Sequence, residues 1–319
     1  MFLARDDRGQ VVNLLEEQDV TGGNFFCPSC GNPVRLKQGK VMRPHFAHVS
    51  LDDCQGYAEN ESAEHLELKA SLFRWARKDH LVQVEAALPE LKQIADLLVG
   101  DKLALEVQCS PLSKNRLAER TQAYQAAGYQ VLWLLGEKLW LGESITKLQR
   151  DFLYFSQSLG FFLWELDLNK QQLRLKYLIH EDLHGQVQYK SKIFPFEEGD
   201  LLEILRLPFQ QKGVASFLAK SDRQICRYVR QQLYFRSAKW MRLQEQLYRS
   251  GENLLTKQAQ DFYPQVRPIE ASYFCQIQQD LTGYYEDFKR YYAETLNKDV
   301  QIVYSPAFYK YYFRKLEKK

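Results

Sequence analysis

The sequence has no long hydrophobic run. Nowhere in its 319 residues does an apolar stretch approach the roughly 18 residues that a membrane-spanning helix requires. The first ten residues also lack the apolar segment of a secretory signal and carry acidic side chains instead. These absences argue against a membrane protein and a secreted protein, and we expect a cytoplasmic location.

Close cysteine pairs are scarce as well. Of six cysteines, only Cys27 and Cys30 lie near each other in the sequence. The other four are scattered along the chain: Cys54, Cys109, Cys226 and Cys275. This spacing argues against a disulfide framework, and in a reducing compartment a single close pair indicates a metal site.

No internal repeat or low-complexity tract interrupts the chain. Its 45% hydrophobic and 26% charged residues are typical of a globular protein rather than a disordered one. A chain of this length can form two or three domains, each with its own core. The net charge is only +3, but residues 206–250 hold ten Lys or Arg against two acids, a local net charge of +8. The cationic surface is therefore concentrated in one part of the chain.

The middle of the chain has the pattern of a mixed sheet flanked by helices. Apolar periodicity predicts a helix over 61–78, and a Gly100-Asp101 turn suits a tight hairpin. Ser113 and Gly128 have the residue types that begin and end a second helix. The strands are predicted over 81–87, 94–99, 103–109 and 129–135. The order α-β-β-β-α-β is that of one compact domain.

The two flanking regions differ from this core. Residues 1–58 contain short extended runs (1–4, 11–15, 34–36) with too little apolar material for an unaided core, which indicates a metal-stapled module. Beyond the core, a small β-meander is predicted over 160–166, 171–179 and 185–194, and helices from 201 onward, with a break around 264–268. We therefore expect an α+β multidomain protein. Its predicted domains are a zinc-ribbon-like module (1–58), the α-β-β-β-α-β core (59–150), and a meander with basic, tyrosine-rich helices (151–319).

The first candidate site is Cys27-Pro-Ser-Cys30 followed, after fourteen residues, by His45-Phe-Ala-His48. Cysteine and histidine are typical zinc ligands, and two close pairs of them supply the four corners of the tetrahedron that zinc prefers. No coordination position is then left open for catalysis. The sequence thus predicts a structural zinc site formed by Cys27, Cys30, His45 and His48. Two alternatives stay open: Cys54 replaces one histidine, or the cysteines and histidines are incidental.

The second candidate site is spread over the predicted core. Asp96 and Glu106 lie on neighbouring strands, and Gln108 points to the same face as Glu106 because side chains alternate along a strand. Two carboxylates within apolar strands repel each other unless a divalent cation lies between them, and such a cation activates water for attack on a phosphodiester. The predicted helix adds three polar side chains: Glu64, His65 and Lys69. The alternative is that Asp96 and Glu106 simply face solvent at strand ends.

The segments around these residues carry a family resemblance. ADLLVGDKLALEVQCS, followed by a Ser-Lys-x-Arg helix, resembles the PD-(D/E)xK nuclease superfamily. Together with CPSCG, RPHFAHVS, ESAEHLELK and RTQAYQAAGYQVLWLLG, it resembles the competence protein CoiA family over about residues 1–140.

The resemblance implies a restriction-endonuclease-like core in which Asp96 and Glu106 bind Mg²⁺ or Mn²⁺. Gln108 stands where the superfamily more often has lysine, and Lys69 on the adjacent helix can supply an equivalent charge from another direction. The resemblance also suggests that Ser110, Arg120 and Tyr124 line the cleft; as ordinary residues they are a turn serine, a helix-surface arginine and a half-buried tyrosine.

The resemblance further implies a metal-dependent deoxyribonuclease, or a related DNA-processing factor, in natural transformation. There, incoming single-stranded DNA is recombined with the chromosome alongside a RecA-type recombinase. The lysine missing at Gln108 favours an alternative, a non-catalytic recombination mediator with a degenerate nuclease fold. A zinc-dependent regulatory DNA-binding protein ranks below both, because a single zinc module without a recognition helix reads no bases.

The basic region supplies the predicted contacts with single-stranded or branched DNA. Arg223, Arg227 and Arg230 share one face of a predicted helix, which Tyr234 continues. Such a stripe makes sequence-independent phosphate contacts, to which tyrosines add stacking on bases. Arg120 is a further candidate contact. The alternative is a solvated helix face, and the aromatic-rich stretch 304–313 is more typical of a buried final helix.

Overall fold

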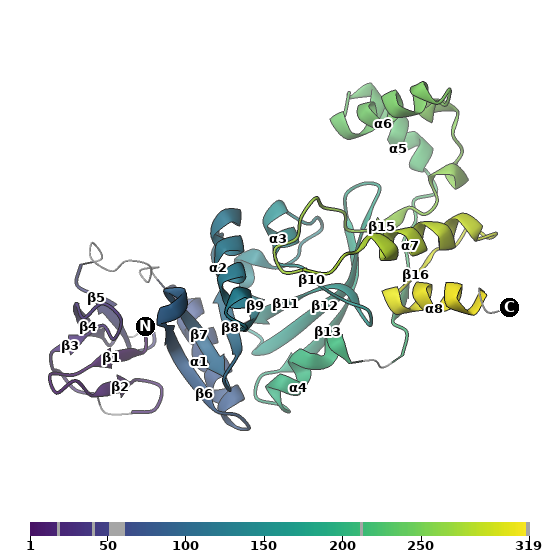
Figure 1. Ribbon diagram of the computed structural model, residues 1–319. Coiled ribbons are helices and arrows are strands. Elements are labelled where there is room, and N and C mark those ends of the chain that lie inside the picture. The colour runs from purple at the N-terminus through teal and green to yellow at the C-terminus, as the bar shows by residue number, and fades with distance from the viewer. Residues whose placement is uncertain (18–19, 40–41, 51–60, 211–212, 317–319) are drawn as a thin grey trace.

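The structure, a computed structural model, describes residues 1–17, 20–39, 42–50, 61–210 and 213–316. Within these ranges the strands form three sheets, of five, nine and two strands. Figure 1 shows the five-stranded sheet at one end of the molecule, the nine-stranded sheet in the middle and helices α5 to α8 at the other end. No helix in the described ranges has the length and apolar content needed to cross a bilayer.

The five-stranded sheet is formed by the N-terminal residues. It has the order β2-β1-β3-β4-β5, and every neighbouring pair is antiparallel. Its strands are β1 (Leu3–Arg5), β2 (Val11–Asn13), β3 (Phe25–Phe26), β4 (Pro33–Lys37) and β5 (His45–His48). Among the residues that the structure describes, six buried ones form its core, including Cys27. So small a core is consistent with the predicted need for a metal staple.

Helix α1 (Ala63–Arg77) packs on the central sheet. Ser62 caps it by accepting a hydrogen bond from the backbone N–H of His65 at 3.1 Å. Nine of its fifteen residues are buried. The helix predicted over 61–78 is therefore confirmed, and it presents polar residues of its first two turns to the sheet.

The elements that follow α1 have the predicted order. They are β6 (Val82–Leu88), β7 (Gln93–Val99), β8 (Leu103–Gln108), α2 (Lys114–Ala126) and β9 (Gln130–Leu135). Strands β6, β7 and β8 pair antiparallel, and β9 lies parallel to β8. Ser113 caps α2, and Gly128 has the positive φ (+77°) expected after a helix end.

The sheet does not end at residue 150, where the sequence predicts a domain boundary. Strand β11 pairs parallel with β9, with Trp164 opposite Leu134, so that the predicted meander extends the same sheet. These strands are β10 (Tyr154–Ser156), β11 (Gly160–Asp167), β12 (Gln172–Asp182) and β13 (Val187–Pro195). All eight residues of β11 are buried, which explains why it forms an interior strand.

The rest of the chain is mainly helical, as predicted. After β13 come α4 (Leu201–Arg206), α5 (Ile225–Tyr234), α6 (Ala238–Arg249), α7 (Thr282–Glu294) and α8 (Pro306–Leu316), whereas α3 (Lys147–Asp151) lies between β9 and β10. Three short strands accompany them: β14 (Ser216–Leu218), β15 (Val266–Pro268) and β16 (Ile302–Tyr304). The predicted break around 264–268 is strand β15, which pairs with β12. Tyr309 and Phe313 of α8 are buried, in keeping with a packed final helix.

Helices α5 and α6 form a separate lobe. Their buried side chains make a small core centred on Ile225, Val229 and Trp240, to which Leu183 of the turn between β12 and β13 also contributes. In Figure 1 this lobe projects away from the nine-stranded sheet. Its outer surface is therefore available to a partner.

Candidate active site

The candidate active site lies where α1 faces strands β6, β7 and β8. Leu97 of β7 is opposite Leu105 of β8, and the next step of that register sets Asp96 opposite Glu106. The backbone N–H of Val107 donates a hydrogen bond to Asp96 Oδ2 at 2.8 Å. The Asp96 carboxylate is thus held against β8, and its other oxygen faces α1.

Lys69 of α1 reaches this carboxylate. Its side chain is 1% exposed, and its ammonium lies 2.8 Å from Glu85 Oε1, 3.5 Å from Asp96 Oδ1 and in contact with Glu61. Burial by itself lowers the pKa of Lys69, but Glu85 and Glu61 outweigh burial and raise it. Lys69 therefore carries a positive charge at neutral pH, surrounded by three carboxylates.

Two of the acids around Lys69, Asp96 and Glu61, have lowered pKa values and are ionised. Burial favours the neutral form of Asp96, yet His65 and Lys69 outweigh it and hold its pKa well below the usual range. Glu61 behaves alike: burial opposes ionisation, and the charge of Lys69 lowers the pKa of Glu61 to about 2. The site is consequently a compact group of paired charges.

His65 completes the group. Its Nε2 lies 3.0 Å from Asp96 Oδ1 and 3.3 Å from Glu61 Oε1. Ligand atoms of Glu61, His65 and Asp96 all lie within 4.8 Å of one another. Two carboxylates and an imidazole suit Mn²⁺ and also accept Mg²⁺ through their oxygens. Glu61, His65 and Asp96 would hold such an ion, and the Lys69 ammonium contacts the carboxylates of Glu61 and Asp96.

Glu85 belongs to the site, although the sequence pattern did not indicate it. The registers Val84 to Leu97 and Ala86 to Ala95 place it opposite Asp96, and its backbone has a left-handed φ of +49°. Both of its carboxylate oxygens accept a hydrogen bond from the backbone N–H of Phe2, at 2.7 and 2.8 Å, and one accepts from Leu3 at 3.0 Å. Glu85 thereby connects the N-terminal sheet to Lys69.

Glu106 occupies a neighbouring position with different partners. Arg120 donates to its Oε1 at 2.8 Å, and the Tyr124 hydroxyl donates at 2.5 Å. Burial raises the pKa of Glu106 to about 7, and Arg120 offsets only part of that rise. Asp96 adds to the rise, which indicates that the two carboxylates are close enough to repel. Glu106 lies outside the group of Glu61, His65 and Asp96, and its role as a metal ligand stays a prediction.

Gln108 and Glu64 are held by backbone groups. The Gln108 amide donates to the carbonyl of Ser110 at 2.7 Å. Glu64 accepts from the backbone N–H of Glu137 at 2.8 Å, beside Gly136. Of the predicted residues, the structure therefore brings His65, Lys69 and Asp96 together, whereas Gln108 and Glu64 bind the loops that follow β8 and β9.

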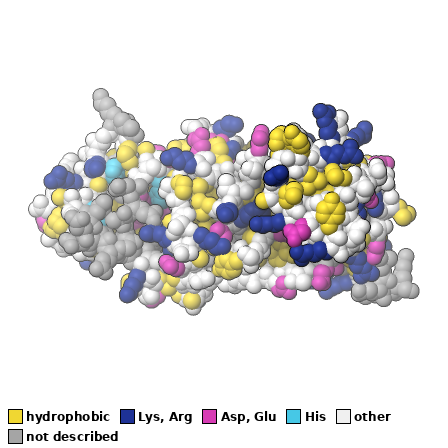
Figure 2. All heavy atoms as spheres, turned by 90° about the horizontal axis from the view of Figure 1, so that it is seen from above, with side chains coloured by type: hydrophobic (Ala, Val, Ile, Leu, Met, Phe, Trp, Pro, Cys, Tyr) yellow, Lys and Arg dark blue, Asp and Glu magenta, His cyan; other side chains and the backbone are white. Residues whose placement is uncertain are grey.

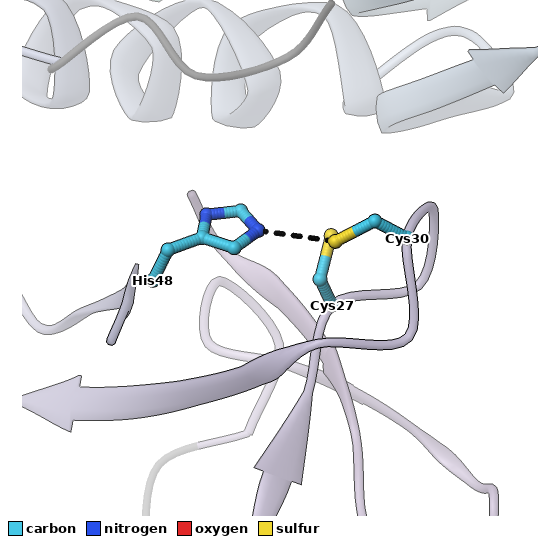
Figure 3. A group of neighbouring side chains, drawn as sticks. All are labelled: Cys27, Cys30 and His48. Carbon is cyan, nitrogen blue, oxygen red and sulfur yellow. Dashed lines mark hydrogen bonds between the residues drawn. The ribbon is translucent and has the colours of Figure 1, made fainter. Parts of the chain in front are cut away.

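The cysteine pair forms a second candidate metal centre (Figure 3). Ligand atoms of Cys27, Cys30 and His48 lie within 4.8 Å of one another, and Cys30 Sγ is 3.5 Å from His48 Nε2. Two sulfurs and one imidazole match the preference of zinc. The residues that would hold the ion are therefore these three.

The structure does not bring His45 to this group. His45 and His48 are three positions apart on β5, so the alternation of a strand directs the two rings to opposite faces. His45 Nδ1 instead lies 2.9 Å from the carbonyl oxygen of Arg43. The alternative ligand Cys54 lies outside the described residues.

The predicted DNA contacts fall into two kinds. Arg223, Arg227 and Arg230 are exposed beside or on α5, and none forms an ion pair with a residue that the structure describes. Arg120, in contrast, binds Glu106 and packs 5.0 Å from the centre of the Trp133 ring. Arg120 therefore belongs to the candidate active site rather than to a basic surface.

Comparison with known families shows the family of the chain. A family described as "Competence protein CoiA, nuclease-like domain" matches residues 61–207, and one described as "Competence protein CoiA, N-terminal domain" matches residues 10–57. The chain belongs to the CoiA family. The nuclease-like match includes all of β11, β12 and β13, in line with their place in the sheet.

A curated relative supports the same family. Competence protein CoiA of Bacillus subtilis (strain 168) is 30% identical over 130 residues. The match covers 40% of this chain and 35% of the relative, so the chain matches only about a third of that CoiA protein's length. No solved structure matches.

Proposed function

We propose that this chain is a metal-dependent nuclease-like factor that processes DNA during natural competence. The observation that carries the proposal is the position of Lys69, whose ammonium lies 3.5 Å from Asp96 within the nuclease-like domain. An acid with a nearby lysine is the arrangement that the superfamily resemblance implies. Here the lysine comes from α1, while Gln108 occupies the strand position.

The residues divide the chemical work as follows. Asp96, Glu61 and His65 would hold Mg²⁺ or Mn²⁺, with Glu106 as a further candidate; the bound ion would polarise a phosphoryl oxygen and lower the pKa of water. Lys69 would place a fixed positive charge beside the carboxylates and stabilise the negative charge that develops on the phosphate. Glu85 would hold Lys69 in that position.

DNA cleavage in Mg²⁺ or Mn²⁺ tests the proposal. Labelled single-stranded, duplex and branched DNA would be incubated with the wild type and with Asp96→Asn. We expect Asp96→Asn to lower the cleavage rate at least about 100-fold, because the metal contributes several kcal/mol to the transition state. Asp101→Asn, at the exposed turn between β7 and β8, is the matched control and should cleave as the wild type does.

The hydrogen bonds that Gln108 and Glu106 make within the protein favour a second function. The Gln108 amide is bound by Ser110, and Glu106 is bound by Arg120 and Tyr124. These contacts support a recombination mediator that binds DNA, and a RecA-type recombinase, without cleaving. No cleavage by the wild type under any of these conditions, with DNA binding intact, would favour this second function over the first.

For the cysteine centre we propose structural zinc. The small core of the N-terminal sheet supports this role.

A further inference from the structure

The turn between α5 and α6 exposes two large aromatic side chains. Tyr234 is 81% exposed and Phe235 66% exposed. Their ring centres are 5.3 Å apart with an interplanar angle of 76°, so each ring keeps a face turned away from the other. Exposed aromatic pairs are costly in water and are common where a partner stacks on them.

The next residue, Arg236, stands where glycine is usual. The backbone N–H groups of Arg236 and Ser237 donate to the carbonyls of Leu233 and Gln232, at 3.0 and 2.9 Å, which closes the helix in a Schellman turn. Arg236 has the left-handed φ of +53° that this turn requires. Glycine adopts this conformation without a penalty, so the arginine places a cationic side chain at this turn at some cost in backbone strain.

Positive charge continues from this turn along α5. Arg227, Arg230 and Tyr234 lie on one exposed face of the helix, opposite the buried Ile225 and Val229. Helix α5 contains no acidic residue. Seen from the side of this lobe, hydrophobic and basic side chains lie interspersed on the surface (Figure 2).

We propose that this turn and the arginine face of α5 bind unpaired DNA. Bases would stack on Tyr234 and Phe235, while Arg227, Arg230 and Arg236 contact the phosphates. A protein partner fits less well, because the acid-free cationic face calls for a polyanion and the aromatic faces suit bases of any sequence. The choice of DNA as the nucleic acid rests on the proposed function.

Fluorescence anisotropy of the full chain in EDTA tests this binding, using a labelled dT30 strand, a 30-base-pair duplex and rU30. We expect Tyr234→Ala/Phe235→Ala to weaken dT30 binding about tenfold or more and duplex binding little, since only unpaired bases stack. Arg227→Gln/Arg230→Gln should weaken binding to both DNAs. For dT30 it should reduce the salt slope by about 1.4, because each phosphate contact on a single strand contributes about 0.7.

Arg236→Gly separates binding from folding. Because glycine accepts the left-handed backbone, this variant should melt no lower than the wild type yet bind dT30 more weakly. Tyr311→Ala, at an exposed tyrosine of α8 (67% exposed), is the matched control and should bind as the wild type does.

Two results would overturn the proposal. One is dT30 affinity within about twofold of the wild type both in Tyr234→Ala/Phe235→Ala and in Arg236→Gly. Tyr234 and Phe235 would then be assigned to contact with a protein partner. The other is tighter binding of rU30 than of dT30. Failure of the proposed function is distinguishable: a wild type that cleaves no DNA, with dT30 binding lost in the lobe variants, rejects the nuclease and retains this site.

Discussion

Lys69 and Glu85 form a buried ion pair 2.8 Å long that joins two parts of the chain. Lys69 comes from α1, which also presents His65 to Asp96, while Glu85 is held by the backbone N–H groups of Phe2 and Leu3, where β1 begins. Because Glu85 has both connections, the position of the Lys69 ammonium depends on how the N-terminal sheet is seated. The N-terminal sheet is thereby part of the support of the candidate active site.

Glu85→Gln should destabilise the protein. The variant leaves the buried Lys69 with Glu61 and Asp96 as its charged partners, so we expect the free energy of unfolding to fall by less than the roughly 3–5 kcal/mol that a wholly unpaired buried charge costs. Urea denaturation measures the change. Glu119→Gln, at an exposed position of α2, should change stability by less than about 0.5 kcal/mol. Equal effects of the two variants would show that Glu85 does not hold Lys69.

If Cys27, Cys30 and His48 bind zinc, substitution of these residues should remove the zinc, whereas substitution of His45 should not. We expect about one equivalent of zinc in the purified protein, lost in Cys30→Ser and in His48→Ala and retained in His45→Ala. Mass spectrometry of the metal content measures this. Loss of zinc in His45→Ala would restore the ligand set expected from sequence. Cys54→Ser tests the remaining alternative.

Gly136→Ala should disturb the loop after β9. An added Cβ would lie 2.7 Å from Cys109 Sγ, 2.8 Å from Glu64 Oε1 and 3.1 Å from the Cys109 backbone. Since backbone cannot move aside cheaply, we expect a loss of about 1–3 kcal/mol in thermal or urea unfolding. Gly142→Ala, whose Cβ would meet nothing within 4 Å, is the matched control. A Gly136→Ala variant as stable as this control would contradict the packing described here.

His180 should make stability depend on pH. It is fully buried between β12 and α7, and burial lowers its pKa to about 4. The unfolded chain, with a histidine pKa of about 6.5, then binds the proton more readily than the folded protein. Stability should therefore fall as the pH drops from about 6.5 to 4, by up to roughly 3 kcal/mol.

Comparison with His180→Gln isolates this effect. The variant lacks the titrating group, so the stability difference between wild type and variant should shrink or reverse toward pH 4. Urea unfolding at several pH values gives the two curves. Parallel curves would mean that His180 does not titrate as its burial requires.

The core elements were predictable because their signals are local. Ser113 caps α2, Gly128 follows its end, and apolar periodicity marks α1. The proximity of Lys69 to Asp96 is not local, since it depends on how α1 crosses the sheet. Glu85 gave no signal, because its role arises from a left-handed residue within a strand.

The histidines and the domain boundary show two other limits. The HxxH spacing of His45 and His48 is typical of a ligand pair on a helix or loop. On strand β5 the same spacing directs the two rings to opposite faces. Strand β11 reads as part of a meander with the strands that follow it. It pairs in parallel with β9, about thirty residues earlier in the chain, and neither segment alone has a sequence pattern that predicts this pairing.

The parallel pairing of β9 with β11 also affects which fragments of the chain can be expressed in soluble form. Until β11 emerges during synthesis, β9 is the open edge of a growing hydrophobic sheet, with Leu134 and Leu135 at the unpaired positions. A fragment ending at residue 150 would keep that edge permanently and expose it to pairing between chains. Solubility should therefore improve sharply once an expressed fragment extends past β13, because β11 then covers β9 and the edge strand on that side, β13, has no buried residue.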